Sequence, residues 1–268
     1  MTDLLQAILL GIVQGLTEFL PVSSSGHLVL IQSLFGADFA FKDDAVLFDL
    51  MLHLGTLLPV LLFYRSEIES LGRAAFHRDD SPAAPQRRYW LLMVLVATVP
   101  TGLIGILFKD RFEALFHDPR AVFGAMLFTA CLLTSTRFVE LKGRGRSIEW
   151  GVALALGVAQ GLAITPGISR SGTTIATALL LRVGRAEAAR FSFIMSIPAI
   201  LGAMVIAAKD GIRFAPDQTL ALAAGFATSA LIGYLALSWL VQLIRYGRFW
   251  WFSLYLFPLS VLGLLLSD

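Results

Sequence analysis

The sequence predicts an all-α integral membrane protein, with six transmembrane helices and two re-entrant helical hairpins arranged as an inverted-topology repeat. Three observations lead to this fold. The 268 residues are 57% hydrophobic and only 15% charged, with a mean hydropathy of +0.76, whereas soluble domains carry about 25% charged residues. Six stretches are long and apolar enough to cross a bilayer. Two further segments are apolar at their ends but polar in the middle.

The six spans follow from length, because a helix needs about 20 apolar residues to cross the hydrocarbon core. They cover residues 46–64, 90–108, 121–139, 191–208, 219–243 and 249–267. The segments with polar centres are 3–34 and 150–181. Residues 1–268 are predicted to form a single membrane domain, with repeat halves 1–146 and 147–268.

Basic residues predict the side of the membrane that each loop faces, because cytoplasmic loops are enriched in Lys and Arg. The loops predicted to be cytoplasmic are 65–89, 137–148, 182–190 and 245–248, and those predicted to be outside are 35–45, 109–120 and 209–218. The spans alternate correctly only if each segment with a polar centre returns to the side from which it came. Both are therefore predicted to be re-entrant, the first from outside and the second from the cytoplasm. Both chain termini then lie outside.

The two hairpin segments are similar to each other at an offset of 146 residues. Gly11, Gln14, Gly15, Leu16, Ser23, Ser25 and Gly26 match Gly157, Gln160, Gly161, Leu162, Ser169, Ser171 and Gly172. Because each half has an odd number of spans, the second half is predicted to be inverted, and such repeats place their site near the bilayer midplane. The two G-x-x-x-G pairs predict close helix contacts.

The predicted tip of each hairpin is polar. In the first, Gln14 and Glu18 share a helix face, Pro21 ends that helix, and His27 lies near the start of the next. In the second, a Pro-Gly pair at 166–167 breaks the helix before S-R-S-G-T-T. The hydroxyl and N–H groups predicted to bind substrate belong to Ser23, Ser25, Gly26, Ser169, Ser171, Gly172 and Thr174.

These groups together indicate phosphoryl transfer. Each tip directs a helix N-terminus at the centre, which favours an anion, and Arg170 adds a guanidinium suited to phosphate. A carboxylate beside a phosphate is repulsive without a mediating cation, so Glu18 and Gln14 are predicted ligands of a divalent metal, Mg²⁺ or Ca²⁺. His27 can act as acid, base or nucleophile, and a serine can also attack.

Two structural alternatives stay open at this point. A glutamate and an arginine at membrane depth each cost about 2.5 kcal/mol or more, and Glu18 and Arg170 could simply neutralise each other. Asp49 and His53 are four residues apart and are expected to face the same cavity. They could act directly, with Asp49 as a further metal ligand, or form a pair that supports the hairpin.

The motifs resemble those of the undecaprenyl-pyrophosphate phosphatases of the bacitracin-resistance type. That family carries (E/Q)-x-x-x-E running into P-V-S-S-x-G-H, and later P-G-x-S-R-S-G-x-T. Here the three segments read Q-G-L-T-E (14–18), P-V-S-S-S-G-H (21–27) and P-G-I-S-R-S-G-T-T (166–174). The resemblance extends over the whole chain.

The resemblance implies hydrolysis of undecaprenyl pyrophosphate to the monophosphate and phosphate, which recycles the lipid carrier for peptidoglycan synthesis and confers bacitracin resistance. It also implies a divalent metal, the bacterial inner membrane and a site that faces the periplasm. By motif position the implied catalytic residues are Glu18, Ser24, His27 and Arg170. Because Gln14 takes the first acidic position of the motif, any second carboxylate on the metal would have to come from Asp49.

A lipid-phosphate flippase is the alternative function, because inverted repeats are typical of transporters. The expected partners are a polyprenyl pyrophosphate substrate and membrane lipid. A net charge of +2 argues against nucleic acid. Oligomeric state is open from the sequence, with a homodimer as one expectation.

Overall fold

The structure, a computed structural model, describes residues 2–35, 41, 45–76, 81–116, 118–139, 145–209 and 218–267. The α-helices are α1 (Thr2–Phe19), α2 (Ser24–Phe35), α3 (Ala45–Phe63), α4 (Arg65–Phe76), α5 (Ala84–Leu107), α6 (Lys109–Phe116), α7 (Pro119–Ser135), α8 (Trp150–Leu162), α9 (Arg170–Leu180), α10 (Arg185–Lys209), α11 (Thr219–Arg245) and α12 (Phe252–Leu266). Two 3₁₀ turns, η2 (Thr136–Phe138) and η4 (Phe249–Trp251), adjoin α7 and α12. These ranges contain no strand, only an isolated bridge between Arg146 and Val183. The all-α prediction is confirmed.

The predicted spans correspond to helices of the structure. Five helices in the described residues are long and apolar enough to cross a membrane: α5, α7 with η2, α10, α11, and α12 with η4. The pair α3 and α4, which is bent by 82°, makes a sixth if the two helices are counted as one span. Both α5 and α10 begin earlier than predicted, because arginine and glutamate are good helix formers beyond the apolar segment. Parts of loops 35–45, 65–89, 109–120, 137–148 and 209–218 lie outside the described residues.

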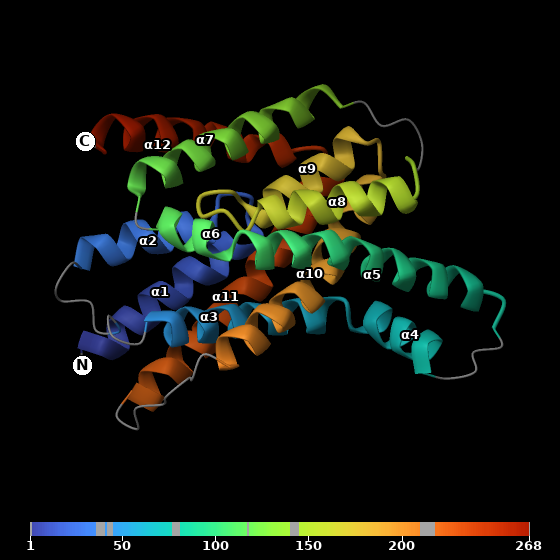
Figure 1. The fold of residues 1–268 in the computed structure, drawn as a ribbon, viewed down its shortest axis with the longest axis horizontal. Coiled ribbons are helices and arrows are strands. Elements are labelled where there is room, and N and C mark those ends of the chain that lie inside the picture. The colour runs from blue at the N-terminus through green and yellow to red at the C-terminus, as the bar shows by residue number, and fades with distance from the viewer. Residues whose placement is uncertain are drawn as a thin grey trace.

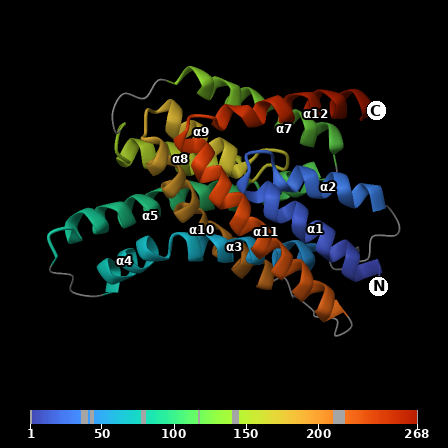
Figure 2. The ribbon, with the colours of Figure 1, turned by 180° about the vertical axis from the view of Figure 1, so that it is seen from behind.

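The two hairpins approach the middle of the molecule from opposite ends (Figures 1 and 2). The first, α1 and α2, starts and finishes at the end where α12 also ends, whereas the second, α8 and α9, lies toward the end that holds α4 and the start of α5. Helix α1 packs against α11, and α8 packs against α5. An inverted repeat would produce this exchange of partners, and the repeat and its two halves stay predictions.

Glycines allow these helices to approach closely, as the G-x-x-x-G pairs predicted. A Cβ atom on Gly11 would lie 2.7 Å from the carbonyl oxygen of Gly225 in α11. A Cβ atom on Gly157 would lie 2.2 Å from the carbonyl oxygen of Ala97 in α5. Both separations are too short for real side chains, so each hairpin is held against its long helix at backbone distance.

The hairpin tips lie within a buried apolar core. Phe19, Val22, Met126, Ile175 and Phe193 belong to one buried cluster that reaches both tips. In contrast, the outer faces of the long helices expose leucine, isoleucine and valine side chains. This distribution is the one expected of helices surrounded by lipid, and the chain is a multi-pass membrane protein.

Candidate active site

The first tip is a tight turn between α1 and α2. Helix α1 ends at Phe19, two residues before Pro21, because proline disfavours the helical conformation in the residue that precedes it. Ser23 then adopts a left-handed backbone conformation, with φ at 71°. Its hydroxyl accepts a hydrogen bond from the Gly26 N–H at 3.2 Å, which caps α2.

The second tip is built on the same plan between α8 and α9. Gly167 has φ at 91°, and a Cβ atom there would lie 2.2 Å from the carbonyl oxygen of Val122, so the turn requires glycine. Ser169 caps α9 by accepting from the Gly172 N–H at 3.1 Å. The Ser169 N–H itself donates to Thr129 Oγ1 of α7 at 3.1 Å.

The two tips meet, as predicted. Arg170, the first residue of α9, places Nη2 at 2.6 Å from Glu18 Oε1. The Gly167 N–H donates to Ser25 Oγ at 3.3 Å. The side chains of Glu18 and Arg170 are only 8% and 16% exposed, so this ion pair bridges the hairpins away from bulk solvent.

Glu18 is the centre of the site. Its Oε2 accepts from Ser24 Oγ at 2.8 Å and from Gln14 Nε2 at 3.2 Å. His53 Nε2 of α3 lies 3.8 Å from the same oxygen. Gln14 Oε1 and Arg170 Nη1 are buried and have no hydrogen-bond partner among the residues that the structure describes. The site therefore has one free oxygen acceptor and one free cationic donor beside a carboxylate that is already oriented.

His27, in the first turn of α2, is held through both ring nitrogens. Its Nδ1 lies 2.8 Å from the carbonyl oxygen of Ser23. Because a carbonyl can only accept, Nδ1 carries the proton in this arrangement. Its Nε2 lies 2.8 Å from the hydroxyl of Tyr255 in α12.

Some of the predicted substrate-binding groups face neighbouring helices. Thr174 Oγ1 is buried and lies 2.5 Å from Ser192 Oγ of α10. Ser171 is fully buried, with its Oγ 3.3 Å from Ser169 Oγ. Ser23 and Ser25 form the equivalent contact at 3.3 Å in the first tip. In each tip, the contact between the two serines thus stabilises the cap of that tip.

The donor set fits a divalent cation that takes part of its coordination from a substrate. No group of three His, Cys, Asp or Glu residues suitable for a metal occurs in the part of the chain that the structure describes. Mg²⁺ is usually held by one or two carboxylates together with substrate phosphates. Glu18 and the free Oε1 of Gln14 match that requirement. Asp49 is partly exposed, and its carbonyl oxygen lies 2.8 Å from His53 Nδ1, which supports that imidazole.

The sequence did not indicate the contacts of Tyr255 and Thr129. For His53 it predicted only that the side chain faces the same cavity as Asp49. Tyrosine and threonine are common in membrane helices, so neither residue stands out in an apolar segment. The available signal for His53 was its ionisable side chain at membrane depth.

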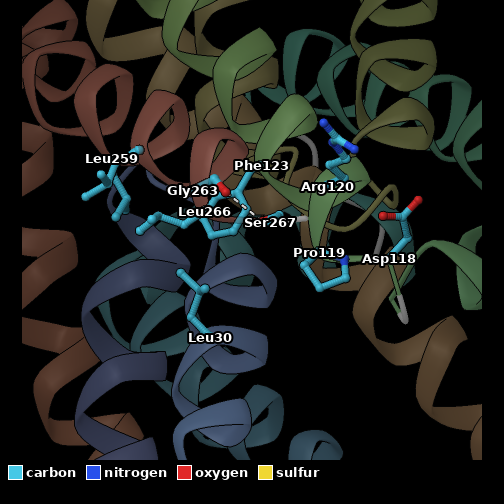
Figure 3. A pocket seen from close by; sticks show the side chains of 10 residues that line it. Leu30, Asp118, Pro119, Arg120, Phe123, Leu259, Gly263, Leu266 and Ser267 are labelled. Atoms are coloured by element: carbon cyan, nitrogen blue, oxygen red, sulfur yellow. Dashed lines mark hydrogen bonds between the residues drawn. The ribbon is translucent and has the colours of Figure 1, made fainter.

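An apolar groove lies between α2, α7 and α12. It has a volume of about 700 Å³ and is lined by Leu30 of α2, Phe123 of α7 and Leu259, Leu262 and Leu266 of α12, with Asp118 and Arg120 among the other lining residues. Figure 3 shows Leu30 pointing toward the side chains of α12. Leu30 follows His27 by three residues and Leu259 follows Tyr255 by four, so the groove begins about one helical turn from that pair.

Comparisons with known proteins agree over nearly the whole chain. The family model described as bacitracin resistance protein BacA matches residues 7–262. The undecaprenyl-diphosphatase of Desulfatibacillum aliphaticivorans is 42% identical over 265 residues, which covers 94% of each chain. That of Carboxydothermus hydrogenoformans is 42% identical over 98% of this chain and 97% of the relative. That of Bacteroides fragilis is 34% identical over 98% of each.

Proposed function

This chain belongs to the bacitracin resistance protein BacA family, and from that premise we propose that it hydrolyses undecaprenyl diphosphate to undecaprenyl phosphate and inorganic phosphate. One observation carries the proposal. Glu18 and Ser24 of one hairpin meet Arg170 of the other, and the buried atoms Gln14 Oε1 and Arg170 Nη1 have no hydrogen-bond partner within the described part of the chain. A diphosphate headgroup and its cation supply what both atoms lack.

Arg170 and the two helix N-termini bind the diphosphate. Of the two terminal nitrogens of the guanidinium, Nη2 donates to Glu18, and Nη1 is available to donate to a phosphate oxygen. The starts of α2 and α9 contribute positive partial charge in a site of low exposure. Negative charge that develops on the phosphoryl oxygens is therefore stabilised by groups that are already in place.

Ser24 is the proposed attacking group, because its hydroxyl already donates to a carboxylate. Ser24 Oγ attacks the terminal phosphorus while its proton passes to Glu18 Oε2, 2.8 Å away. The bond from that phosphorus to the bridging oxygen breaks, and undecaprenyl phosphate leaves. Water then hydrolyses the phosphoserine and releases phosphate. His27, three residues along α2, supplies a second proton-transfer group.

Glu18 and Gln14 would hold a divalent cation, Mg²⁺ or Ca²⁺, through a carboxylate oxygen and an amide oxygen. Such a cation would neutralise phosphate oxygens and offset the repulsion between Glu18 and the headgroup. Because Gln14 is neutral, Glu18 provides the only carboxylate of this pair.

The apolar groove suits the isoprenoid tail. Leu30 of α2, which lines the groove, follows His27 by one helical turn, so a tail in the groove would lie close to a diphosphate at the hairpin tips. Replacing Leu262 by Trp is expected to raise KM for a long-chain prenyl diphosphate about tenfold and for a short-chain one less than twofold. Equal effects on both substrates would exclude the groove as the tail site.

We further propose that the protein works in the bacterial inner membrane with its site facing the periplasm, since the loop charges predict that the first hairpin enters the membrane from outside. A homodimer stays a proposal to be tested by the mass of the protein in detergent.

Phosphate release from the purified full-length chain tests the function. Given a prenyl diphosphate and Mg²⁺ in detergent, the protein should release phosphate, EDTA should stop the release, and a trapped intermediate should carry phosphate on Ser24. Substrate binding without any phosphate release would instead support the lipid-phosphate carrier.

A further inference from the structure

Tyr255 makes a side-chain contact with His27 that the proposed reaction does not yet use. It lies on α12, the last helix of the chain, and its hydroxyl is 2.8 Å from His27 Nε2. The two rings lie nearly parallel, 5.8 Å apart at an angle of 21°. Hydrogen bond and ring contact together restrict both the position and the tilt of the imidazole.

The backbone of Ser23 determines which nitrogen Tyr255 meets. Its left-handed conformation, φ 71°, holds a carbonyl oxygen that accepts from His27 Nδ1–H at 2.8 Å. The left-handed conformation is unfavourable for serine, so this arrangement is maintained by its surroundings. With the proton on Nδ1, Nε2 has the lone pair, and the Tyr255 hydroxyl must donate to it.

A phenol suits this position because it can reverse its role. When Nε2 is unprotonated, the tyrosine O–H donates to it. When Nε2 gains a proton, the imidazolium N–H donates to the phenol oxygen instead. The imidazole therefore keeps a partner in either protonation state, until a substrate oxygen replaces the phenol. A phenylalanine could do neither.

We propose that Tyr255 is a positioning residue for His27: it keeps Nε2 as the reactive nitrogen and holds the imidazole ring oriented before the headgroup arrives. The proposal rests on the proposed function in that it assigns His27 a part in phosphoryl transfer. A ring that is already oriented does not have to be ordered during the reaction. Tyr255 is therefore expected to raise kcat and to leave KM nearly unchanged.

Kinetics of the full-length protein test the proposal with Tyr255→Phe. The matched control is Tyr246→Phe, directly after α11, since Tyr246 is 74% exposed. Loss of one hydrogen bond is expected to lower kcat roughly three- to tenfold, with KM within twofold. Tyr246→Phe should match the wild type. An unchanged kcat would overturn the proposal, and so would a raised kcat, because the phenol would then be holding His27 out of use.

A double-mutant cycle separates positioning from general support of the fold. In a His27→Ala background, Tyr255→Phe should have no further effect on the residual rate. An equal fall in both backgrounds would mean that Tyr255 does not act through His27.

Nitrogen NMR of ring-¹⁵N-histidine protein gives a readout that needs no turnover. The His27 signal, identified by its loss in His27→Ala, should show a protonated Nδ1 and an Nε2 that accepts a hydrogen bond. Tyr255→Phe should move the Nε2 resonance toward that of a free imine nitrogen, and Tyr246→Phe should not. An Nε2 resonance unaffected by Tyr255→Phe would refute the proposal. A wild type that releases no phosphate would refute the function while leaving this result interpretable.

Discussion

The two hairpins share a backbone plan and differ in chemistry. Ser23 and Ser169 cap α2 and α9 through nearly identical hydrogen bonds, of 3.2 Å to Gly26 N and 3.1 Å to Gly172 N. At the offset of 146, however, Glu18, Ser24 and His27 correspond to Ile164, Arg170 and Thr173. The first hairpin supplies the carboxylate, hydroxyl and imidazole, and the second supplies the cation.

This difference suggests why one hairpin is insufficient. Each tip alone is a helix N-terminus with serine hydroxyls, which is enough to attract an anion. The acid–base groups and the guanidinium come together only where the tips touch, at the 2.6 Å contact between Glu18 and Arg170. A substitution should therefore have a large effect where the hairpins differ and a small effect where they are alike.

The largest expected effect is that of Glu18→Gln, which removes the proposed base and the charged ligand of the cation. Phosphate release should fall on the order of 10³-fold. Ile164→Leu, at the equivalent position of the second hairpin, should stay within twofold of the wild type. If Glu18→Gln kept more than a tenth of the wild-type activity, this would contradict the proposed chemical difference between the two hairpins.

Arg170→Lys should lower kcat/KM about 10²-fold, because lysine cannot contact Glu18 and a phosphate oxygen with two nitrogens of one planar group. Arg146→Lys is the control, since Arg146 pairs with Glu149 in an exposed contact of 2.8 Å. Equal activities for the two variants would mean that Arg170 acts only as a point charge.

Substitutions of the two buried glutamines, Gln14 and Gln160, should distinguish an effect on metal binding from an effect on packing. Gln14→Leu should raise the Mg²⁺ concentration for half-maximal activity about tenfold, the size of effect seen when a supporting ligand is lost. Gln160 Oε1 likewise has no partner among the described residues, but the residue four positions on is Ile164 and not a carboxylate, and its Nε2 lies 3.4 Å from the carbonyl oxygen of Met195 and from Thr101 Oγ1. Gln160→Leu should lower thermal stability without changing the Mg²⁺ dependence, and a changed dependence would count against this assignment.

The smallest expected effect is on the melting temperature, and it differs between the caps formed by Ser23 and Ser169. Ser23→Gly removes a cap but also relieves a left-handed serine, so the melting temperature should rise or stay unchanged. Ser169, the N-cap of α9, has φ at −73°, and Ser169→Gly should lower the melting temperature slightly. Equal shifts would show that the backbone at Ser23 is not strained.

Much of this architecture could be predicted from the sequence, because polar residues at membrane depth are costly and therefore conspicuous. Glu18 and Arg170 stood out for that reason, and the Pro residues at 21 and 166 marked the breaks between helices. The helices α4 and α6 were not predicted, since short amphipathic helices between spans have no clear apolar signature.

The remaining features depend on tertiary contact. The left-handed backbone of Ser23 and the contact of Tyr255 with His27 join residues that no local pattern relates. The contact of Thr174 with Ser192 arises from the packing of α9 on α10. Residue type thus indicated the chemistry, whereas the partners of each group required the structure.

An experimental structure with a methylene-bridged prenyl diphosphonate and Mg²⁺ would test most directly whether the two hairpins bind one headgroup together. The terminal phosphonate should contact Arg170 and Ser24 together, with the cation between it and Glu18. A diphosphonate bound elsewhere, with Glu18 and Arg170 still joined only to each other, would contradict a shared headgroup site.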